Sequence, residues 1–403
     1  MTVSSQSGTV PVTIGVPRET FPGERRVAIT PRRCEALAKL GTNVVFEHSA
    51  GLQAGFTDDQ YVARGARPAS RVELFQAAQV ILQVRCLGAN PEQGRADLPL
   101  FRPGQVLIGF GEPLTALKEC SDLAAAGVSF FAMELVPRIT RAQGMDALSS
   151  MATFAGYEAV VLAAAALPKI FPMLMTAGGT ITPAKILVLG AGVAGLQAIA
   201  TARRLGAVVW AYDVRQAAKE QVESVGAKFL NLDLDLDAGA AEEKSGYAKP
   251  MDEAFYRRQR ERLAEALTGQ DVVITTAAVP GRKAPLLITA EMAGRMIPGA
   301  VIVDLAADRG GNCELTRAGE TIIHKGVTII GPVNLASRAA FHASQMYGSN
   351  LTAFLRLLIR DGALHLNRND EIIRETLVTH ANEIVHPQVS QLCSAAALTG
   401  QER

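Results

Sequence analysis

Residues 185–213, KILVLGAGVAGLQAIATARRLGAVVWAYD, decide the fold of this chain. A short apolar run leads directly into Gly190, Gly192 and Gly195, which have the spacing GxGxxG, and then into apolar residues at helical spacing. Such glycines permit a tight turn, the close approach of a pyrophosphate and the packing of helix on strand. The helix N-terminus then offers free N–H groups to phosphates. The stretch therefore predicts a dinucleotide-binding βαβ unit, the alternative being a Rossmann fold that binds nothing.

The acidic residue that closes this stretch bears on the choice of dinucleotide. Asp213 ends the second strand, 18 residues after Gly195. A carboxylate there accepts hydrogen bonds from the adenosine ribose and repels a 2′-phosphate, which favours NAD over NADP. Arg215, two positions further on, weakens this inference because a cation can neutralise such a phosphate.

Short β-branched runs alternate with helical segments on both sides of the glycine turn. This alternation predicts an α/β protein with two Rossmann-like domains and mainly parallel sheets. The expected strands are 13–19, 42–48, 79–84, 105–110 and 128–136 in the first series, then 185–190, 207–213, 227–230, 271–278, 301–306 and 327–331 in the second.

The domain boundaries follow from two helical regions. A helix is expected over 149–167, and the chain becomes helical again from about residue 340. A tail after a complete six-strand domain often packs back on the first domain, which makes that domain discontinuous. We expect an N-terminal domain over 1–148, completed by 340–403, and a nucleotide-binding domain over 149–339.

Composition excludes several classes of protein. Forty basic residues against 39 acidic ones give a formal charge of +1, so no nucleic-acid partner is expected. Five dispersed cysteines without CxxC spacing argue against a disulfide framework, and no cluster with ligand spacing predicts a metal. The N-terminus lacks the features of a signal peptide, and a reducing cytosol fits best. The apolar run 159–179 contains Lys169, Pro168 and Pro172, and is expected to form a buried helix rather than a membrane span.

Residues 137–151, PRITRAQGMDALSSM, concentrate polar side chains in an otherwise apolar region. They include no His, Cys, Glu or Lys that could act as acid, base or nucleophile. One interpretation is a group that positions a ligand without transferring protons. The other is a helix cap, in which Asp146 or Ser149 caps the following helix and Arg138 and Arg141 are solvated.

Several motifs together resemble the NAD(H)-binding component of proton-translocating NAD(P) transhydrogenase, in the alanine dehydrogenase/transhydrogenase family. They are GVPRETFPGERRVAITP (15–31), RITRAQGMDALSSMATFAGYEAV (138–160), LGAGVAGLQAIATARRLGA (189–207) and DLAADRGGNCELT (304–316). The resemblance implies an assembly in which hydride passes directly from NAD(H) here to NADP(H) on a separate partner domain. A membrane-spanning subunit translocates protons in such an assembly. It also implies a homodimer in the cytoplasm, attached to the inner face of the cell membrane through its partners.

The same resemblance implies the site residues. Arg138, Gln143, Asp146 and Ser149 would hold the nicotinamide carboxamide, the nearby ribose and the pyrophosphate side of NAD. A lid is expected over 231–256, with Gly246 and Tyr247 at its tip, although a solvated acidic insertion is the alternative. The predicted catalytic group is Arg138, Gln143, Asp146, Ser149 and Tyr247. The predicted cofactor contacts are Arg138, Gln143, Gly190, Gly192, Val193, Ala194, Gly195, Asp213, Val214, Arg215, Gly246 and Ala278.

Two other functions stay open. Alanine dehydrogenase shares the fold, but its chemistry needs a proton-transferring residue, usually His, and no histidine occurs within 49–323. Arg26 matches the family's carboxylate-binding arginine, whereas Arg85 stands at the position of its substrate-binding lysine. A non-catalytic NAD sensor would have no need of nicotinamide positioning. Gly144, in place of the usual Ser, and residues 331–338 depart from the transhydrogenase pattern.

Overall fold

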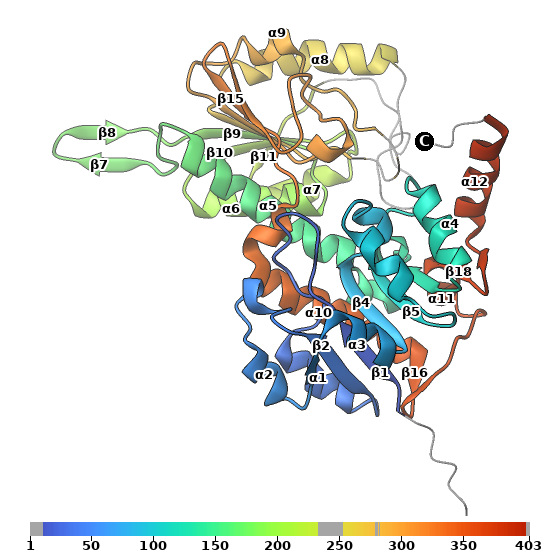
Figure 1. Cartoon of the computed structure of the whole chain (residues 1–403). Helices are drawn as coiled ribbons and strands as arrows, with labels where there is room; N and C mark the ends of the chain where they lie inside the picture. Colours follow the sequence, from blue (N-terminus) through green and yellow to red (C-terminus); the bar gives the residue numbers. More distant parts are fainter. Residues whose placement is uncertain (1–10, 233–252, 279–280, 282, 400–403) are drawn as a thin grey trace, which may run out of the picture. The chain divides into compact units, whose positions relative to one another are not determined.

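The structure is a computed structural model that describes residues 11–232, 253–278, 281 and 283–399 (Figure 1). The chain divides into two compact units. Unit 1 comprises Met1–Met151 and Ala339–Arg403, and unit 2 comprises Ala152–Arg338.

Unit 1 contains an eight-stranded sheet. Its order is β19-β18-β6-β5-β4-β1-β2-β3, and all neighbouring pairs from β6 to β3 are parallel. β18 pairs antiparallel with β6 and with β19, so the C-terminal tail completes the sheet. The strands are β1 Thr13–Val16, β2 Asn43–Glu47, β3 Arg67–Ala69, β4 Val80–Arg85, β5 Val106–Phe110, β6 Ser129–Ala132, β18 Leu377–His380 and β19 Glu383–Ile384.

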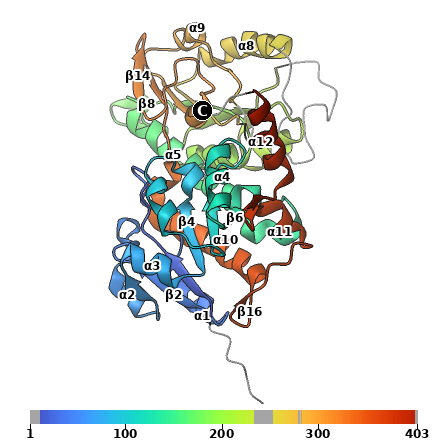
Figure 2. The same cartoon turned by 45° about the vertical axis from the view of Figure 1, so that its right-hand side comes forward.

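Helices cover this sheet, and the last helix lies beside α4 in both views (Figures 1 and 2). A small antiparallel hairpin, β16 Ile359–Arg360 with β17 Ala363–Leu364, follows the long α10. The helices of unit 1 are α1 Pro31–Ala38, α2 Asp58–Val62, α3 Arg71–Ala77, α4 Leu117–Ala125, α10 Ala340–Leu358, α11 Glu371–Thr376 and α12 Pro387–Thr399, and the short 3-10 helices are η1 Leu52–Ala54, η2 Leu87–Ala89, η3 Gly94–Leu100, η4 Met133–Leu135 and η5 Thr140–Met145.

Unit 2 contains a seven-stranded sheet in the order β11-β10-β9-β12-β13-β15-β14. All pairs are parallel except that of β14 with β15. In the central β9, Ile186 and Val188 join one buried cluster and Leu187 and Leu189 join another. Burial on both faces explains why this strand is a continuous apolar run. The strands are β9 Lys185–Leu189, β10 Val208–Tyr212, β11 Lys228–Phe229, β12 Val272–Thr275, β13 Val301–Asp304, β14 Thr321–His324 and β15 Val327–Ile330.

The helices of unit 2 follow its strands in alternation. They are α6 Val193–Arg204, α7 Ala218–Ser224, α8 Glu253–Leu267 and α9 Ala290–Ala293, with the 3-10 helices η6 Ala307–Arg309 and η7 Leu335–Ala339. α5, Ala147–Ala166, continues from unit 1 into unit 2. Within the described ranges, α5 is the one helix long and apolar enough to cross a membrane by length and composition. Only 39% of its most apolar window is buried, and because core helices pass the same test this is weak evidence for a span.

The prediction of one buried helix through the apolar run 159–179 is wrong beyond Ala166. Pro168 and Pro172 lack the N–H that a helix needs, and the helix ends before them. The chain then forms an antiparallel hairpin of β7 Leu174–Thr176 and β8 Gly179–Ile181. Every residue of both strands is exposed, and in Figure 1 the hairpin extends away from the sheet of unit 2.

The predicted fold class is confirmed: both sheets are mainly parallel, and the first α/β domain is discontinuous. Each predicted strand corresponds to an observed strand, mostly one to four residues shorter. The sequence interpretation missed β3, β14, β18 and β19, which are short and lie at the sheet edges or beside them. Such strands need little apolar alternation because few of their residues face a core.

Candidate cofactor site

The glycine turn of unit 2 leaves no room for side chains at two of its three glycines. Gly190 follows β9 with φ of 101°, a conformation that L side chains rarely adopt. A Cβ on Gly195 would lie 1.9 Å from the carbonyl oxygen of Gly190, so only glycine permits α6 to begin this close to the turn. A Cβ on Gly192, in contrast, would meet no atom within 4 Å. Space therefore remains in front of the turn, as the approach of a pyrophosphate requires.

The first turn of α6 faces this space. Gly192 is the N-cap, and Val193 and Ala194 are the first helical residues. Gly192 and Val193 are exposed and Ala194 is half-buried. The first N–H groups of a helix lack partners within it and carry a partial positive charge, so this end suits an anion.

Asp213 follows β10 and is bound to the glycine turn. Its Oδ2 accepts from the backbone N–H of Ala191 at 2.7 Å, which fixes the carboxylate beside the turn. Arg215 donates to it from its backbone N–H at 2.9 Å and from Nε and Nη2 at 3.0 Å each. The carboxylate thus accepts four hydrogen bonds, about as many as its lone pairs provide for.

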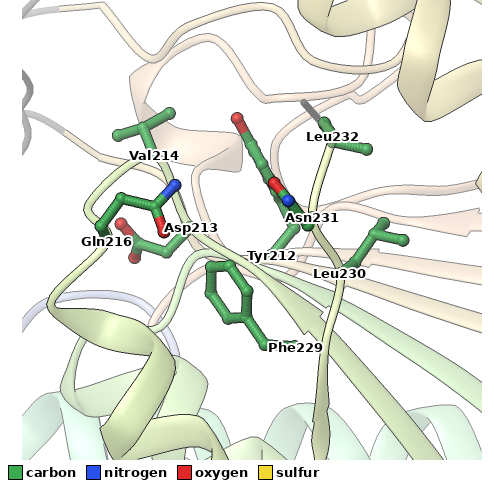
Figure 3. Close-up of a pocket in the computed structure, with 8 residues that line it drawn as sticks. All are labelled: Tyr212, Asp213, Val214, Gln216, Phe229, Leu230, Asn231 and Leu232. Carbon is green, nitrogen blue, oxygen red and sulfur yellow. The ribbon is translucent and has the colours of Figure 1, made fainter. Parts of the chain in front are cut away.

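A pocket lies at the carboxyl end of β10 and β11. Figure 3 shows Asp213 and Gln216 on one side of it, Leu230, Asn231 and Leu232 on the other, and the ring of Phe229 between them. In an open parallel sheet, ligands bind at this edge of the strands. The lining residues are Tyr212, Asp213, Val214, Gln216, Phe229, Leu230, Asn231 and Leu232.

The remaining predicted contact in unit 2 follows the neighbouring strand. Ala278 is exposed and lies three residues after β12, which adjoins β9 where the strand order reverses. The loop beside it is held by Asn312, whose Oδ1 accepts from the N–H of Ala277 and whose Nδ2 donates to its carbonyl. Asn312 is fully buried, and its backbone N–H donates to Asp304 at 2.7 Å.

Sequence reasoning missed Asn312 and Asp304 as supports of this edge. Asp304 is fully buried at the end of β13 and accepts from five groups: the hydroxyls of Thr275 and Thr316 and the backbone N–H groups of Ala306, Asn312 and Cys313. An acidic residue directly after the apolar run VIV was the available signal. Asn312 had none, because its two partner segments are distant in the sequence.

The polar segment predicted to position the nicotinamide lies in unit 1. Asp146 is the N-cap of α5: its Oδ1 accepts from the N–H of Ser149 at 2.8 Å and its Oδ2 from the Ser149 hydroxyl at 2.6 Å. The capping interpretation is therefore observed for Asp146. Both Asp146 and Ser149 remain half-buried. A cap still leaves one edge of each group open to a ligand.

The rest of the segment presents its polar side chains outward. Arg138 and Gln143 are exposed, while Ala142 and Met145 are buried beneath them. Arg141 is not merely solvated, because it forms a two-pronged ion pair with Asp370. Gly246 and Tyr247, the predicted tip of the lid, lie outside the described residues. The other four predicted catalytic residues thus share one short stretch of unit 1.

A buried charge cluster occupies the corresponding edge of the unit 1 sheet. β1 and β4 adjoin where the strand order reverses, and Arg26 and Arg85 both bind Glu24 there. Arg26 is only 5% exposed and donates to Glu24 from Nε at 2.8 Å and Nη2 at 2.6 Å. Although burial opposes ionisation, these guanidinium groups lower the pKa of Glu24 to about 2. The carboxylate-binding capacity of Arg26 is thus used by the chain itself.

Two further carboxyls near this edge have raised pKa values. Burial, and then the nearby charge of Glu24, raise the pKa of Glu19 to about 8, although the backbone N–H groups of Val84 and Arg85 donate to it. Burial raises the pKa of Glu134 to about 7. Both groups therefore change charge near neutral pH.

Fold and site together define a protein of the NAD-binding, Rossmann-like class of oxidoreductases. The N- and C-terminal domain models of the alanine dehydrogenase/PNT family match residues 15–155 and 159–387. The chain belongs to this family.

Relatives of known name refine its place there. In Rhodospirillum rubrum, the first of the chains that make up NAD(P) transhydrogenase subunit alpha is 45% identical over 391 residues, which cover 96% of this chain and 99% of that one. The crystal structure of transhydrogenase from Sinorhizobium meliloti, also 45% identical, covers 93% of this chain and 100% of its own, with a TM-score of 0.82. An alanine dehydrogenase of Methanococcus maripaludis is 31% identical over 310 residues, 75% of this chain and 74% of its own. The chain is thus more similar to these transhydrogenases than to this dehydrogenase.

Proposed function

We propose that the chain is the NAD(H)-binding component of a proton-translocating NAD(P) transhydrogenase. It passes hydride directly between NAD(H) bound here and NADP(H) bound to a partner domain. The observation that carries this proposal is the 45% identity to a transhydrogenase alpha subunit over nearly the whole of both chains. The recognition element of that activity, the stretch from Arg138 to Ser149, is complete except for Gly144.

The site residues suit this chemistry. NAD(H) supplies or accepts the hydride, and no proton moves at the reacting carbons, so the protein needs no acid or base there. Its task is to aim one nicotinamide at the other. The glycine turn, the start of α6 and Asp213 would bind the pyrophosphate and adenosine, and Val214, Arg215 and Ala278 would border them. Arg138, Gln143, Asp146 and Ser149 would hold the nicotinamide end.

The partners follow from the same proposal. A membrane subunit translocates protons, a separate domain binds NADP(H), and the chain is held at the inner face of the cell membrane through them. We also propose a homodimer. The hairpin β7–β8 supports it, because Met173, Leu174, Met175 and Ile181 expose apolar surface there. An isolated two-stranded hairpin is only marginally stable in water, so such a surface is expected to be covered.

Alanine dehydrogenase activity is disfavoured by the charge cluster of unit 1. A substrate carboxylate would need Arg26, but both prongs of its guanidinium already bind Glu24. Displacing Glu24 would leave a buried carboxylate without its partner, which is strongly unfavourable.

The proposed function is tested by Gln143→Ala in the complete assembly. Because most binding contacts come from unit 2, NADH affinity should stay nearly unchanged. Hydride transfer should slow at least roughly tenfold, a loss of about 1.4 kcal/mol in transition-state stabilisation. Equilibrium NADH titration and stopped-flow transfer between the two nucleotides measure the two quantities. Gln76→Ala, at another exposed glutamine, is the matched control and should affect neither.

The outcomes separate the interpretations. Transfer at the unchanged rate would reduce the polar segment to a helix cap. A loss of rate in proportion to lost NADH binding would make Gln143 an ordinary binding contact. Absence of transfer by the wild-type assembly would contradict the proposed function itself.

A further inference from the structure

We propose that Asn350 and Asp370 are positioning residues for hydride transfer. They come from the C-terminal part of unit 1 and hold the segment 141–144, which carries Gln143. This inference rests on the proposed function and adds two residues that contact no nucleotide themselves.

The first anchor precedes Gln143 by two residues. Arg141 donates from Nη1 to Asp370 Oδ2 at 2.7 Å and from Nη2 to Asp370 Oδ1 at 3.0 Å. Asp370 is itself fixed, because it is the N-cap of α11 and accepts from the N–H of Ile372 at 2.9 Å. The Arg141 guanidinium lowers the pKa of Asp370, so the pair stays ionised at neutral pH.

The second anchor follows Gln143 by one residue. Asn350, in the middle of α10, donates from Nδ2 to the carbonyl of Gly144 at 2.9 Å. Asn350 is 5% exposed, and its Oδ1 is buried with no hydrogen-bond partner among the described residues. The two anchors thus bracket Gln143 from two different helices.

The segment needs such anchors because it has little rigidity of its own. It forms the 3-10 helix η5, whose hydrogen bonds are poorer than those of an α-helix. Ala142 and Met145 are buried, but they fix only one side of it. A displacement of about 1 Å at a reacting group can cost roughly a hundredfold in rate. Small shifts of η5 would therefore be felt at the nicotinamide.

Stability alone does not account for either contact. The Arg141 side chain is 50% exposed, and ion pairs in such positions contribute about 0–1 kcal/mol. A buried, unpaired oxygen such as Asn350 Oδ1 costs about 1–3 kcal/mol, a cost that a leucine at this position would avoid. Both groups are better explained by where they hold the chain than by how much they stabilise it.

The ion pair is tested by Asp370→Asn, Arg141→Gln and their combination. Asn is also a good N-cap, so Asp370→Asn removes the pair and leaves the start of α11 intact. We expect unchanged NADH affinity and melting temperature, hydride transfer slower by roughly threefold to tenfold, and no further loss in the double variant. Glu35→Gln, which removes the exposed pair of Glu35 with Arg64, is the control and should leave transfer unchanged.

The amide is tested by Asn350→Leu. We expect transfer slower by at least roughly tenfold at unchanged NADH affinity, that is, a fall in kcat without a matching change in KM. Hydrogen exchange of the peptide 137–146 should become faster while the rest of the chain keeps its protection. A purely structural role would instead lower protection throughout unit 1.

These measurements decide the inference. It is overturned if Asp370→Asn and Asn350→Leu transfer hydride at the wild-type rate, or if lost transfer is matched by lost NADH affinity or by general unfolding. If the wild-type assembly and Glu35→Gln bind NADH but transfer nothing, the proposed function fails together with it. Faster exchange confined to 137–146, together with slower transfer, supports it.

Discussion

Asp213 and Arg215 decide the choice of dinucleotide jointly, because Arg215 fills lone pairs of the carboxylate that a ribose hydroxyl would use. Asp213→Ala removes the ribose contact and the repulsion of a 2′-phosphate, so it should narrow the preference for NADH over NADPH. Arg215→Ala frees the carboxylate and removes the cation that could neutralise that phosphate, so it should widen the preference. Fluorescence titration of both variants with both nucleotides measures the two ratios. A shift in the same direction for both variants would contradict this account.

Among the secondary structure elements, the hairpin β7–β8 has the most exposed apolar surface for its size. Met175 is 75% exposed, and an aspartate there should oppose association of two chains without disturbing either sheet. We expect Met175→Asp to shift the chain from dimer to monomer in analytical ultracentrifugation, with an unchanged melting temperature. Ile323→Asp on β14, whose side chain is also 75% exposed, is the matched control and should stay dimeric. Equal masses for both variants would remove the hairpin from the interface.

The stability of the entire chain should carry the signature of Glu19. Its carboxyl keeps a proton up to about pH 8 in the folded protein but loses it near the ordinary value of 4.5 when unfolded. The folded state therefore binds more protons between these values, and the free energy of unfolding should fall as pH rises across that window. Glu19→Gln does not titrate, so its decline should be shallower by up to about 1.4 kcal/mol per pH unit.

Urea unfolding at several pH values between 5 and 8 measures both slopes. The absolute stability of Glu19→Gln is expected to be lower, because its amide nitrogen meets a backbone N–H of Val84 or Arg85. The difference in slope is therefore the diagnostic quantity. Parallel curves for the wild type and the variant would show that Glu19 ionises normally.

Local sequence was informative wherever one element carries its own evidence. The strands buried on both faces, such as β9, are continuous apolar runs, and the glycine turn is specified by three residues within six positions. Asp213 could be placed beside that turn because parallel strands β9 and β10 end at the same edge. The end of α5 near Pro168 was also readable, but the hairpin beyond it was not. Its apolar residues are exposed, contrary to what an apolar run normally indicates.

The sequence by itself determined the fold class, the family, the glycine turn and the polar segment 137–151, because each depends on residues close together in the chain. The site residues remain predictions, since no nucleotide contact has tested them. Only the tertiary structure decided which groups support them: Asn350 and Asp370 reach a segment more than 200 positions earlier. It also decided that Glu24 occupies Arg26 and that Arg215 occupies Asp213. A side chain's free valence depends on which partner the fold brings to it, and no local pattern records that.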